Sequence, residues 1–264
     1  MITAERRLAL TDLIEEQAVF TVESLAHRFG ISTQTVRRDL RALEGQGLLR
    51  RTYGGAVVRG VASSPELAFH TREEAYRPQK EAIARATLRL LTPGQTVMFD
   101  ASSTVLHLAR LLPADFEGTA VVNALPVAYE LGRKTKLNVT FLGGTLRRSS
   151  LSFVGPLAES ALRKLYVDTA LISAKGCSAS HGLTEANPYE AQLKEYVVTR
   201  SKTVLALIDS SKLERTALVQ FGTADCVHTL ITDWGARPEA VEALRQAGVT
   251  VVIAEDPAEH WRTG

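Results

Sequence analysis

The sequence lacks the features that mark several classes of protein. Its 264 residues include only two cysteines, Cys177 and Cys226, which lie far apart and form no CxxC pair. They predict neither a disulfide scaffold nor a zinc site, and a reducing cytoplasm is the expected compartment. No apolar run approaches the roughly 18 residues of a membrane span. The first residues carry acids and arginines where a signal peptide needs an apolar stretch.

Motifs for metal, nucleotide and nucleophilic chemistry are missing as well. The six histidines are scattered without HxxxH or HExxH spacing, and there is neither a P-loop nor a complete GxGxxG run. The sequence therefore predicts no metal, no cofactor and no catalytic residues. With 45% apolar and 23% charged residues, the chain can bury a core. Its length allows one large domain, or a small domain and a medium one.

Lysine is absent until Lys80, so the positive charge of the N-terminal part comes from arginine. Seven arginines face two acids between residues 28 and 59, although the whole chain has a net charge of only +2. A basic region confined to one short stretch of a nearly neutral protein is typical of a nucleic-acid-binding surface. A solvated charged face would give the same count, so the motifs within the stretch must decide between the two.

The first 60 residues predict a winged helix-turn-helix. Apolar residues at helical spacing predict helices over about 3–17, 23–30 and 33–46. Gly30 is expected to end the second helix, Ser32 to cap the third, and Gly47 to stop it. Two strand-like pieces around Gly54–Gly55 predict a hairpin, which would form the wing.

The third helix divides into an apolar side and a polar side. Val36, Leu40 and Leu43 would face inward, and the outward positions suit base edges and phosphates. Asp39 is the exception, and it is expected to orient Arg38 or a neighbouring arginine. The residues predicted to contact DNA are Ser32, Thr33, Gln34, Thr35, Arg37, Arg38 and Arg41 on this helix, and Arg50, Arg51 and Tyr53 on the hairpin.

The stretch ESLAHRFGISTQTVRRDLRALEGQGLLRRTYGGAV resembles the DeoR family of bacterial transcription regulators, whose pattern is VSxxTIRRDLxxLexxGLLxRxHGGA. This resemblance implies a winged helix-turn-helix that binds double-stranded operator DNA. It also implies a cytoplasmic protein that associates with the nucleoid when bound. Tyr53 stands where the pattern usually has His, but tyrosine can still reach a phosphate.

Residues 58–74, which are rich in small residues, are expected to link a DNA-binding domain at 1–57 to a second domain at 75–264. In that domain, apolar strand candidates alternate with helical stretches from about residue 79 onward. Such alternation favours a mostly parallel, Rossmann-like α/β sheet flanked by helices. The predicted fold class is therefore α/β, with an N-terminal winged helix-turn-helix joined to the α/β domain.

Polar residues follow the predicted strands of the second domain, where an open parallel sheet collects its ligands. Ser102, Ser103 and Thr104 also open a helix, which makes them a natural phosphate site, although an ordinary serine cap would look the same. The strand-end residues are Asp100 with Ser102, Ser103 and Thr104; Asn123; Gly143 and Gly144; Lys175, Gly176 and Glu185; and Asp209 and Lys212.

This half resembles the sensor domain of DeoR-type regulators, which is similar to sugar-phosphate isomerases such as ribose-5-phosphate isomerase. The resemblance adds Arg72 and Lys80, and it implies a phosphorylated sugar or related metabolite as effector. By the same resemblance the 102–104 hydroxyls would hold the phosphate, and Lys80 and Lys212 would add positive charge. The groups expected to accept sugar hydroxyls are Asp100, Asp209 and Glu185. Val122 stands where the family more often has Thr.

The sequence thus predicts a ligand-responsive regulator, a repressor of a sugar or carbon-metabolism operon that acts as a dimer or tetramer. The segment 58–80, with Arg72 and Lys80, would couple effector binding to DNA binding. Two alternatives stay open. A sugar-phosphate isomerase could draw on Asp100, Glu185, Lys175 or Lys212 for acid–base chemistry. A constitutive architectural DNA-binding protein would ignore small molecules.

Overall fold

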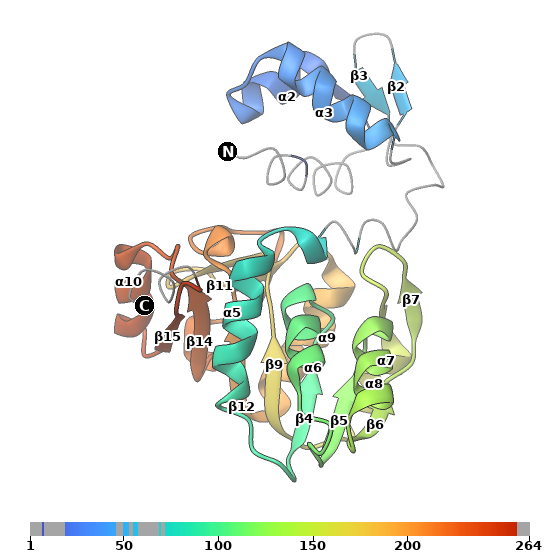
Figure 1. Ribbon diagram of the computed structural model, residues 1–264, viewed down its shortest axis with the longest axis vertical. Helices are drawn as coiled ribbons and strands as arrows, with labels where there is room; N and C mark the ends of the chain where they lie inside the picture. Colours follow the sequence, from blue (N-terminus) through green and yellow to red (C-terminus); the bar gives the residue numbers. More distant parts are fainter. Residues whose placement is uncertain are drawn as a thin grey trace. The chain divides into compact units, whose positions relative to one another are not determined.

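The computed structural model describes residues 7, 19–45, 50–52, 55–57, 69 and 72–257. The chain forms two compact units, Met1–Ala75 and Tyr76–Gly264. Each unit is taken by itself below; both are drawn in Figure 1. No helix among the described residues is long and apolar enough to cross a membrane.

The described residues of the first unit include two successive helices and a small sheet. Its helices are α2 (Val22–Phe29) and α3 (Thr33–Gly45). The strands β1 (Val19–Thr21), β2 (Arg50–Thr52) and β3 (Gly55–Val57) form an antiparallel sheet in the order β1-β3-β2. This arrangement confirms the predicted second and third helices and the hairpin. The helix predicted at 3–17, apart from Arg7, and the stop at Gly47 lie outside the described residues.

Local sequence signals explain the sharp turn between the two helices. Gly30 has a φ of +60°, a left-handed conformation that suits glycine, and Ile31 N–H donates to the carbonyl of Ala26 at 3.1 Å. Ser32 then caps α3, because its hydroxyl accepts the Thr35 N–H at 3.2 Å. The turn therefore changes the direction of the chain between α2 and α3, which pack against each other. The apolar core between the helices consists of Val22, Leu25, Val36, Leu40 and Leu43.

The second unit is built on a seven-stranded parallel sheet in the order β15-β14-β12-β9-β4-β5-β6. Its strands are β4 (Thr96–Phe99), β5 (Thr119–Val122), β6 (Asn138–Phe141), β9 (Val167–Ile172), β12 (Ser201–Leu207), β14 (Thr229–Asp233) and β15 (Thr250–Ala254). Its helices are α5 (Arg77–Leu88), α6 (Ser103–Leu111), α7 (Leu125–Lys134), α8 (Pro156–Leu162), α9 (Pro188–Arg200) and α10 (Pro238–Gln246).

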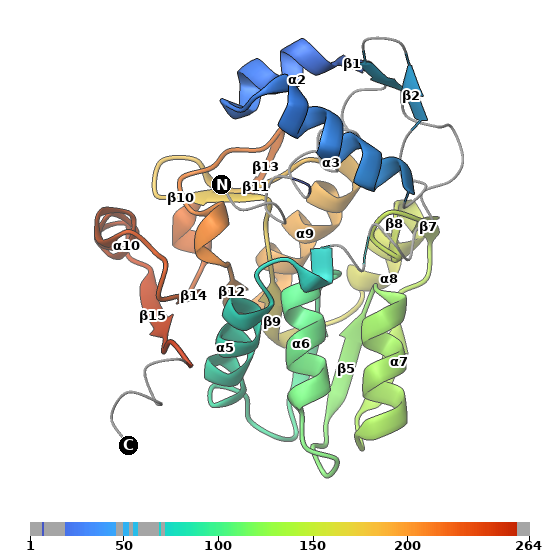
Figure 2. The same cartoon turned by 45° about the horizontal axis from the view of Figure 1, so that its top comes forward.

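Helices cover both faces of this sheet. Figures 1 and 2 show α5, α6 and α7 side by side on one face. Residues of α8, α9 and α10 share an apolar cluster with the opposite face. The smaller elements are the hairpin β7 (Thr145–Arg147) and β8 (Ser152–Val154), the antiparallel sheet β10 (Gly176–Ser178), β11 (Gly182–Glu185) and β13 (Val219–Gly222), and the single turns η1 (Ser210–Lys212) and η2 (Ala224–Cys226).

The strand order reverses once, and this reversal places the site. The chain runs outward from β4 through β5 to β6, then returns to β9 beside β4 and runs outward on the other side. In open sheets of this kind, ligands bind at the carboxyl ends of the strands near the reversal. The predicted Rossmann-like sheet is confirmed, and the polar ends of β4, β5, β6, β9 and β12 all meet at this edge.

Candidate DNA-binding and effector sites

The outward side of α3 carries polar and basic side chains, as predicted. Its apolar residues Val36, Leu40 and Leu43 are fully buried. The Thr35 hydroxyl is half-buried and lies 2.9 Å from that of Ser32. The exposed side chains are Ser32, Thr33, Gln34, Arg37, Arg38 and Arg41. The backbone of Arg50 and Arg51 lies in β2, but their side chains and the whole of Tyr53 fall outside the described residues.

Asp39 lies on the inner side of α3, although it is flanked by arginines. Its side chain is fully buried, and its Oδ1 accepts a hydrogen bond from Arg7 Nε at 3.2 Å. The sequence predicts a neighbouring arginine, such as Arg38, as the partner of Asp39. The Arg7 partner instead comes from 32 residues earlier in the chain.

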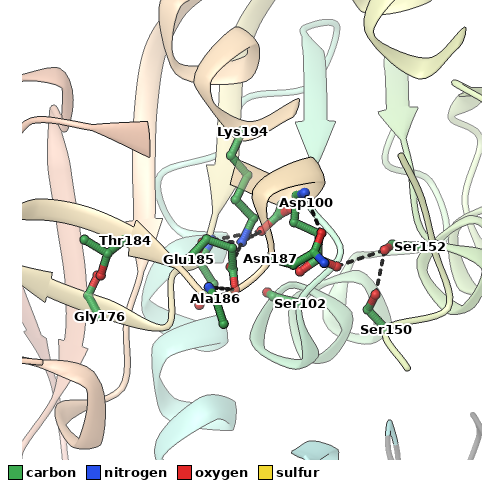
Figure 3. Close-up of polar contacts among 12 residues, drawn as sticks. Asp100, Ser102, Ser150, Ser152, Gly176, Thr184, Glu185, Ala186, Asn187 and Lys194 are labelled. Atoms are coloured by element: carbon green, nitrogen blue, oxygen red, sulfur yellow. Dashed lines mark hydrogen bonds and ion pairs between the residues drawn. The ribbon is translucent and has the colours of Figure 1, made fainter. Parts of the chain in front are cut away.

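In the second unit, a buried ammonium group joins three strand ends. Lys194 on α9 donates to Glu185 Oε2 at 2.7 Å and to the Ser173 carbonyl at 2.8 Å, and its Nζ lies 3.2 Å from Asp100 Oδ2. The Ser173 N–H also donates to Asp100, at 3.1 Å. Figure 3 shows the Lys194 side chain ending beside Glu185 and Asp100. Lys194 thus fixes two carboxylates from β11 and the end of β4 in one place.

The charges of this cluster depend on one another. Burial raises the pKa of Asp100 above its ordinary value, and the Lys194 ammonium and the Ser173 amide oppose this only in part. Burial alone would lower the pKa of Lys194, but the carboxylates of Asp100, Glu185 and Glu190 outweigh it and raise that pKa. Lys194 is therefore a permanent cation, and its loss would leave buried acids without compensation.

A second network ties the β7–β8 hairpin to α9. Ser152 donates to Glu190 Oε1 at 3.0 Å, and Arg147 lies 3.2 Å from the same oxygen. Ser150 lies 2.7 Å from the Ser152 hydroxyl and accepts from Arg147 at 3.1 Å. Asn187 caps α9 by accepting the Glu190 N–H at 3.2 Å. The start of α9 is thereby held against both the hairpin and the strand ends.

The start of α6 combines a helix cap with buried polar atoms. Ser102 accepts the Val105 N–H at 3.0 Å, and Ser103 is half-buried. Among the described residues, the buried Thr104 Oγ1 has no hydrogen-bond partner. The same holds for Asn123 Oδ1 at the end of β5, within the part of the chain that the structure covers. Polar atoms buried without a protein partner are costly, so a ligand or water is expected to satisfy them.

A further charged group follows β12. Asp209 is fully buried, and its Oδ2 lies 3.2 Å from Lys212 Nζ. Burial raises the pKa of Asp209, but the ammonium groups of Lys212 and Lys80 outweigh this effect, and the pKa lies below its ordinary value. Lys80 is itself buried, in the first turn of α5. The structure thus brings Lys80 into the electrostatic surroundings of Asp209.

The remaining residues predicted for the effector site take part mainly in contacts of the fold itself. Gly176 opens β10, where a Cβ atom would lie 2.3 Å from the Arg215 carbonyl oxygen, so close backbone packing requires glycine there. The Lys175 N–H pairs with the Thr184 carbonyl at 2.9 Å. Arg72 belongs to the first unit, where it lies over the Phe69 ring at 5.8 Å. Gly143 and Gly144 connect β6 to β7.

Sequence reasoning missed the residues that hold the cluster together, namely Lys194, Ser173, Glu190, Arg147 and Ser152. Glu190 and Lys194 stand four residues apart on a helix, and this spacing usually marks an exposed ion pair. The available signal was their position directly after the Asn187–Pro188 helix start, at the edge where the strand ends collect.

A winged helix-turn-helix joined to an α/β unit with polar strand ends defines a class: DNA-binding regulators with a sensor domain. Residues 6–60 match the DeoR-like helix-turn-helix domain, and residues 76–234 match the DeoR C-terminal sensor domain. The chain therefore belongs to the DeoR family of transcription regulators, as the sequence analysis predicted. It is a regulator rather than an enzyme.

Relatives of known name span nearly the whole chain. The L-fucose operon activator of Escherichia coli (strain K12) is 34% identical over 232 residues, which cover 87% of this chain and 95% of the relative. The putative aga operon transcriptional repressor of Escherichia coli O157:H7 is 30% identical over 252 residues, 95% and 94% of the two chains. Ribose 5-phosphate isomerase A of Methanocaldococcus jannaschii aligns with a TM-score of 0.38 and 14% identity over 51% of this chain and 53% of its own.

Proposed function

We propose that this regulator controls a carbohydrate operon, and that a phosphorylated sugar at the carboxyl edge of the parallel sheet governs its binding to operator DNA. The observation that carries the proposal is a juxtaposition. Buried carboxylates held by Lys194 lie at the same sheet edge as a capped helix start with an unpartnered buried hydroxyl, that of Thr104 among the described residues. The relatives named after sugar operons support the effector class.

The arrangement defines the orientation in which the effector would bind. The start of α6 offers backbone N–H groups, the positive end of a helix dipole and the hydroxyls of Ser102, Ser103 and Thr104, which suit a phosphate. The cluster around Lys194 offers carboxylate oxygens, which repel a phosphate and accept hydrogen bonds from hydroxyl groups. The phosphate would therefore lie at α6, and the sugar hydroxyls would point toward Asp100 and Glu185.

The remaining predicted residues extend this site. Lys80 and Lys212 would add positive charge, and Asp209, which they surround, would accept a hydroxyl. Asn123, with its buried Oδ1, and the backbone at Gly143, Gly144, Lys175 and Gly176 would complete the strand-end edge. Arg72 and the segment 58–80 would couple the site to DNA binding. The DNA contacts would come from the outward side of α3 and from Arg50, Arg51 and Tyr53.

The chain would act as a homodimer or homotetramer in a bacterial cytoplasm, bound to nucleoid DNA. One recognition helix reads few base pairs, so paired copies on a two-fold symmetric operator would supply the specificity. Repression is the proposed sign. Because the names of the relatives include a repressor and an activator, a transcription assay with the operator and the effector decides this point.

A thermal-shift screen tests the effector class. The probes are sugar phosphates, their unphosphorylated parents and inorganic phosphate. A ligand at about 100 times its Kd should stabilise the chain by roughly 2.7 kcal/mol. We expect at least one sugar phosphate to do so, and its parent sugar to fail at the same concentration. A parent sugar that stabilises as well as its phosphate, or a panel without any hit, would contradict the proposal.

A further inference from the structure

Asp39 occupies an unusual position on the recognition helix. The buried residues of α3 are Val36, Asp39, Leu40 and Leu43, so one of the four carries a charge. Its side chain is 0% exposed, and its partner Arg7 is 31% exposed. Replacing a buried ion pair by apolar side chains of similar size is often neutral or stabilising. Packing alone therefore does not explain an acid here.

Electrostatics alone does not explain it either. Arg37, Arg38 and Arg41 are exposed on the same helix and would face the negative charge of DNA. A carboxylate among them lowers the positive potential that attracts phosphates. By charge, Asp39 therefore opposes the function that the DeoR family assigns to this helix.

A geometric role fits the observed contacts. The apolar attraction that buries Val36, Leu40 and Leu43 is non-directional, so it specifies the rotation of the helix about its axis less strictly than a hydrogen bond does. A charge-assisted hydrogen bond is directional, and the Arg7 Nε–Asp39 Oδ1 bond of 3.2 Å holds the inner side of α3 at a fixed point. Fixing the inner side also fixes the directions in which the outward residues point, because the helix turns as one body.

We propose that Arg7 and Asp39 are a positioning pair that sets the rotation of α3 and thereby the sequence specificity of DNA binding. The pair itself contacts no DNA in this account. Base contacts depend on placement more strictly than phosphate contacts do, because base edges are read by directed hydrogen bonds. Loss of the pair should therefore weaken specific binding and spare non-specific binding.

The test compares two DNA probes. One is a duplex that the wild-type chain recovers from a random-sequence pool, and the other is a scrambled duplex of the same composition. Asp39→Asn should lower the affinity for the selected duplex about tenfold or more, and leave the affinity for the scrambled duplex equal or higher. Glu44→Gln is the matched control, with the same charge change on the same helix, and should keep the ratio of the two affinities.

Arg7 supplies an independent variant that leaves α3 unchanged. Arg7→Gln should lower the ratio as Asp39→Asn does, and Arg7→Lys should restore most of it. The inference is overturned if Asp39→Asn binds both duplexes more tightly, which is the purely electrostatic outcome. Equal weakening of both duplexes, the structural outcome, also overturns it. So does a wild-type chain that enriches no sequence, because the pair would then have no specificity to set.

Discussion

The two units use charge in opposite ways. In the first unit, the arginines of α3 are exposed on a helix whose other side is buried by apolar residues. In the second unit, Asp100, Glu185, Glu190 and Lys194 are all buried and held by short contacts. DNA binds on the surface of the protein, so the arginines that contact its phosphates can stay solvated until the complex forms. A small ligand that must be enclosed requires charges that are fixed beforehand, which costs desolvation and makes every partner necessary.

The largest effect is expected where the buried charges depend on a single cation. Lys194→Met should destabilise the second unit by about 3–5 kcal/mol, because it leaves buried carboxylates without their partner. For a unit of this size, that is a fall in Tm of roughly 10 °C. Urea unfolding of the full chain measures it. Lys202→Met removes an exposed lysine from β12 and serves as the control, with little expected change. Equal stability of the two variants would contradict the claim that the buried carboxylates depend on Lys194.

The exposed charges should behave differently. Arg38→Ala should leave the unfolding midpoint unchanged, because the side chain is exposed. It should weaken binding to a selected operator duplex about 5- to 150-fold, the loss of about 1–3 kcal/mol expected for one guanidinium contact to a base. Fluorescence anisotropy at fixed salt provides the measurement. Arg200→Ala removes an exposed arginine of the second unit, and a similar loss there would show that overall charge, not the helix, determines affinity.

Thr104 lets stability and function be separated within the second unit. Its buried hydroxyl has no partner among the described residues, so Thr104→Val should keep stability or raise it by up to about 1 kcal/mol. The same change should lower the affinity for an effector phosphate, about tenfold by isothermal titration. Thr199→Val, at an exposed position of α9, is the matched control. A variant that is less stable but binds normally would place the hydroxyl in the fold and not in the site.

The effect expected at Asp209 depends on pH. The pKa of Asp209 is lowered in the folded chain, so the unfolded chain takes up a proton first as the solution is acidified. The stability from this carboxylate is therefore present above its ordinary pKa of about 3.9 and lost as the pH falls through the lower folded-state value. Asp209→Asn should cost about 1–3 kcal/mol at pH 7. Unfolding experiments should show this difference shrinking below about pH 4, and a constant difference would contradict the account.

The contrast between the units also explains what the sequence could predict. The helix-turn-helix depends on signals between close neighbours, such as Gly30, Ser32 and the apolar spacing of α3, and these are legible in sequence. The alternation of strands and helices predicted the sheet, and its strand ends predicted Asp100, Asn123 and Asp209. Lys194 and the Arg7–Asp39 pair join residues far apart in the chain. The strand order and the packing of α9 bring the partners of Lys194 together, and the folding of the first unit brings Arg7 to Asp39, so neighbouring residues carry no sign of either contact.

In the proposed function, a phosphorylated effector bound by the sensor unit changes the affinity of the chain for DNA. The most direct measurement is the Kd of a sugar phosphate, found in the screen, with and without a saturating operator duplex. Coupling is reciprocal, so a ligand that changes DNA affinity must bind with a different affinity when DNA is present. The account predicts a difference of about fivefold or more. Equal Kd values in the two titrations would contradict it, because the sensor unit would then bind its ligand without influencing DNA binding.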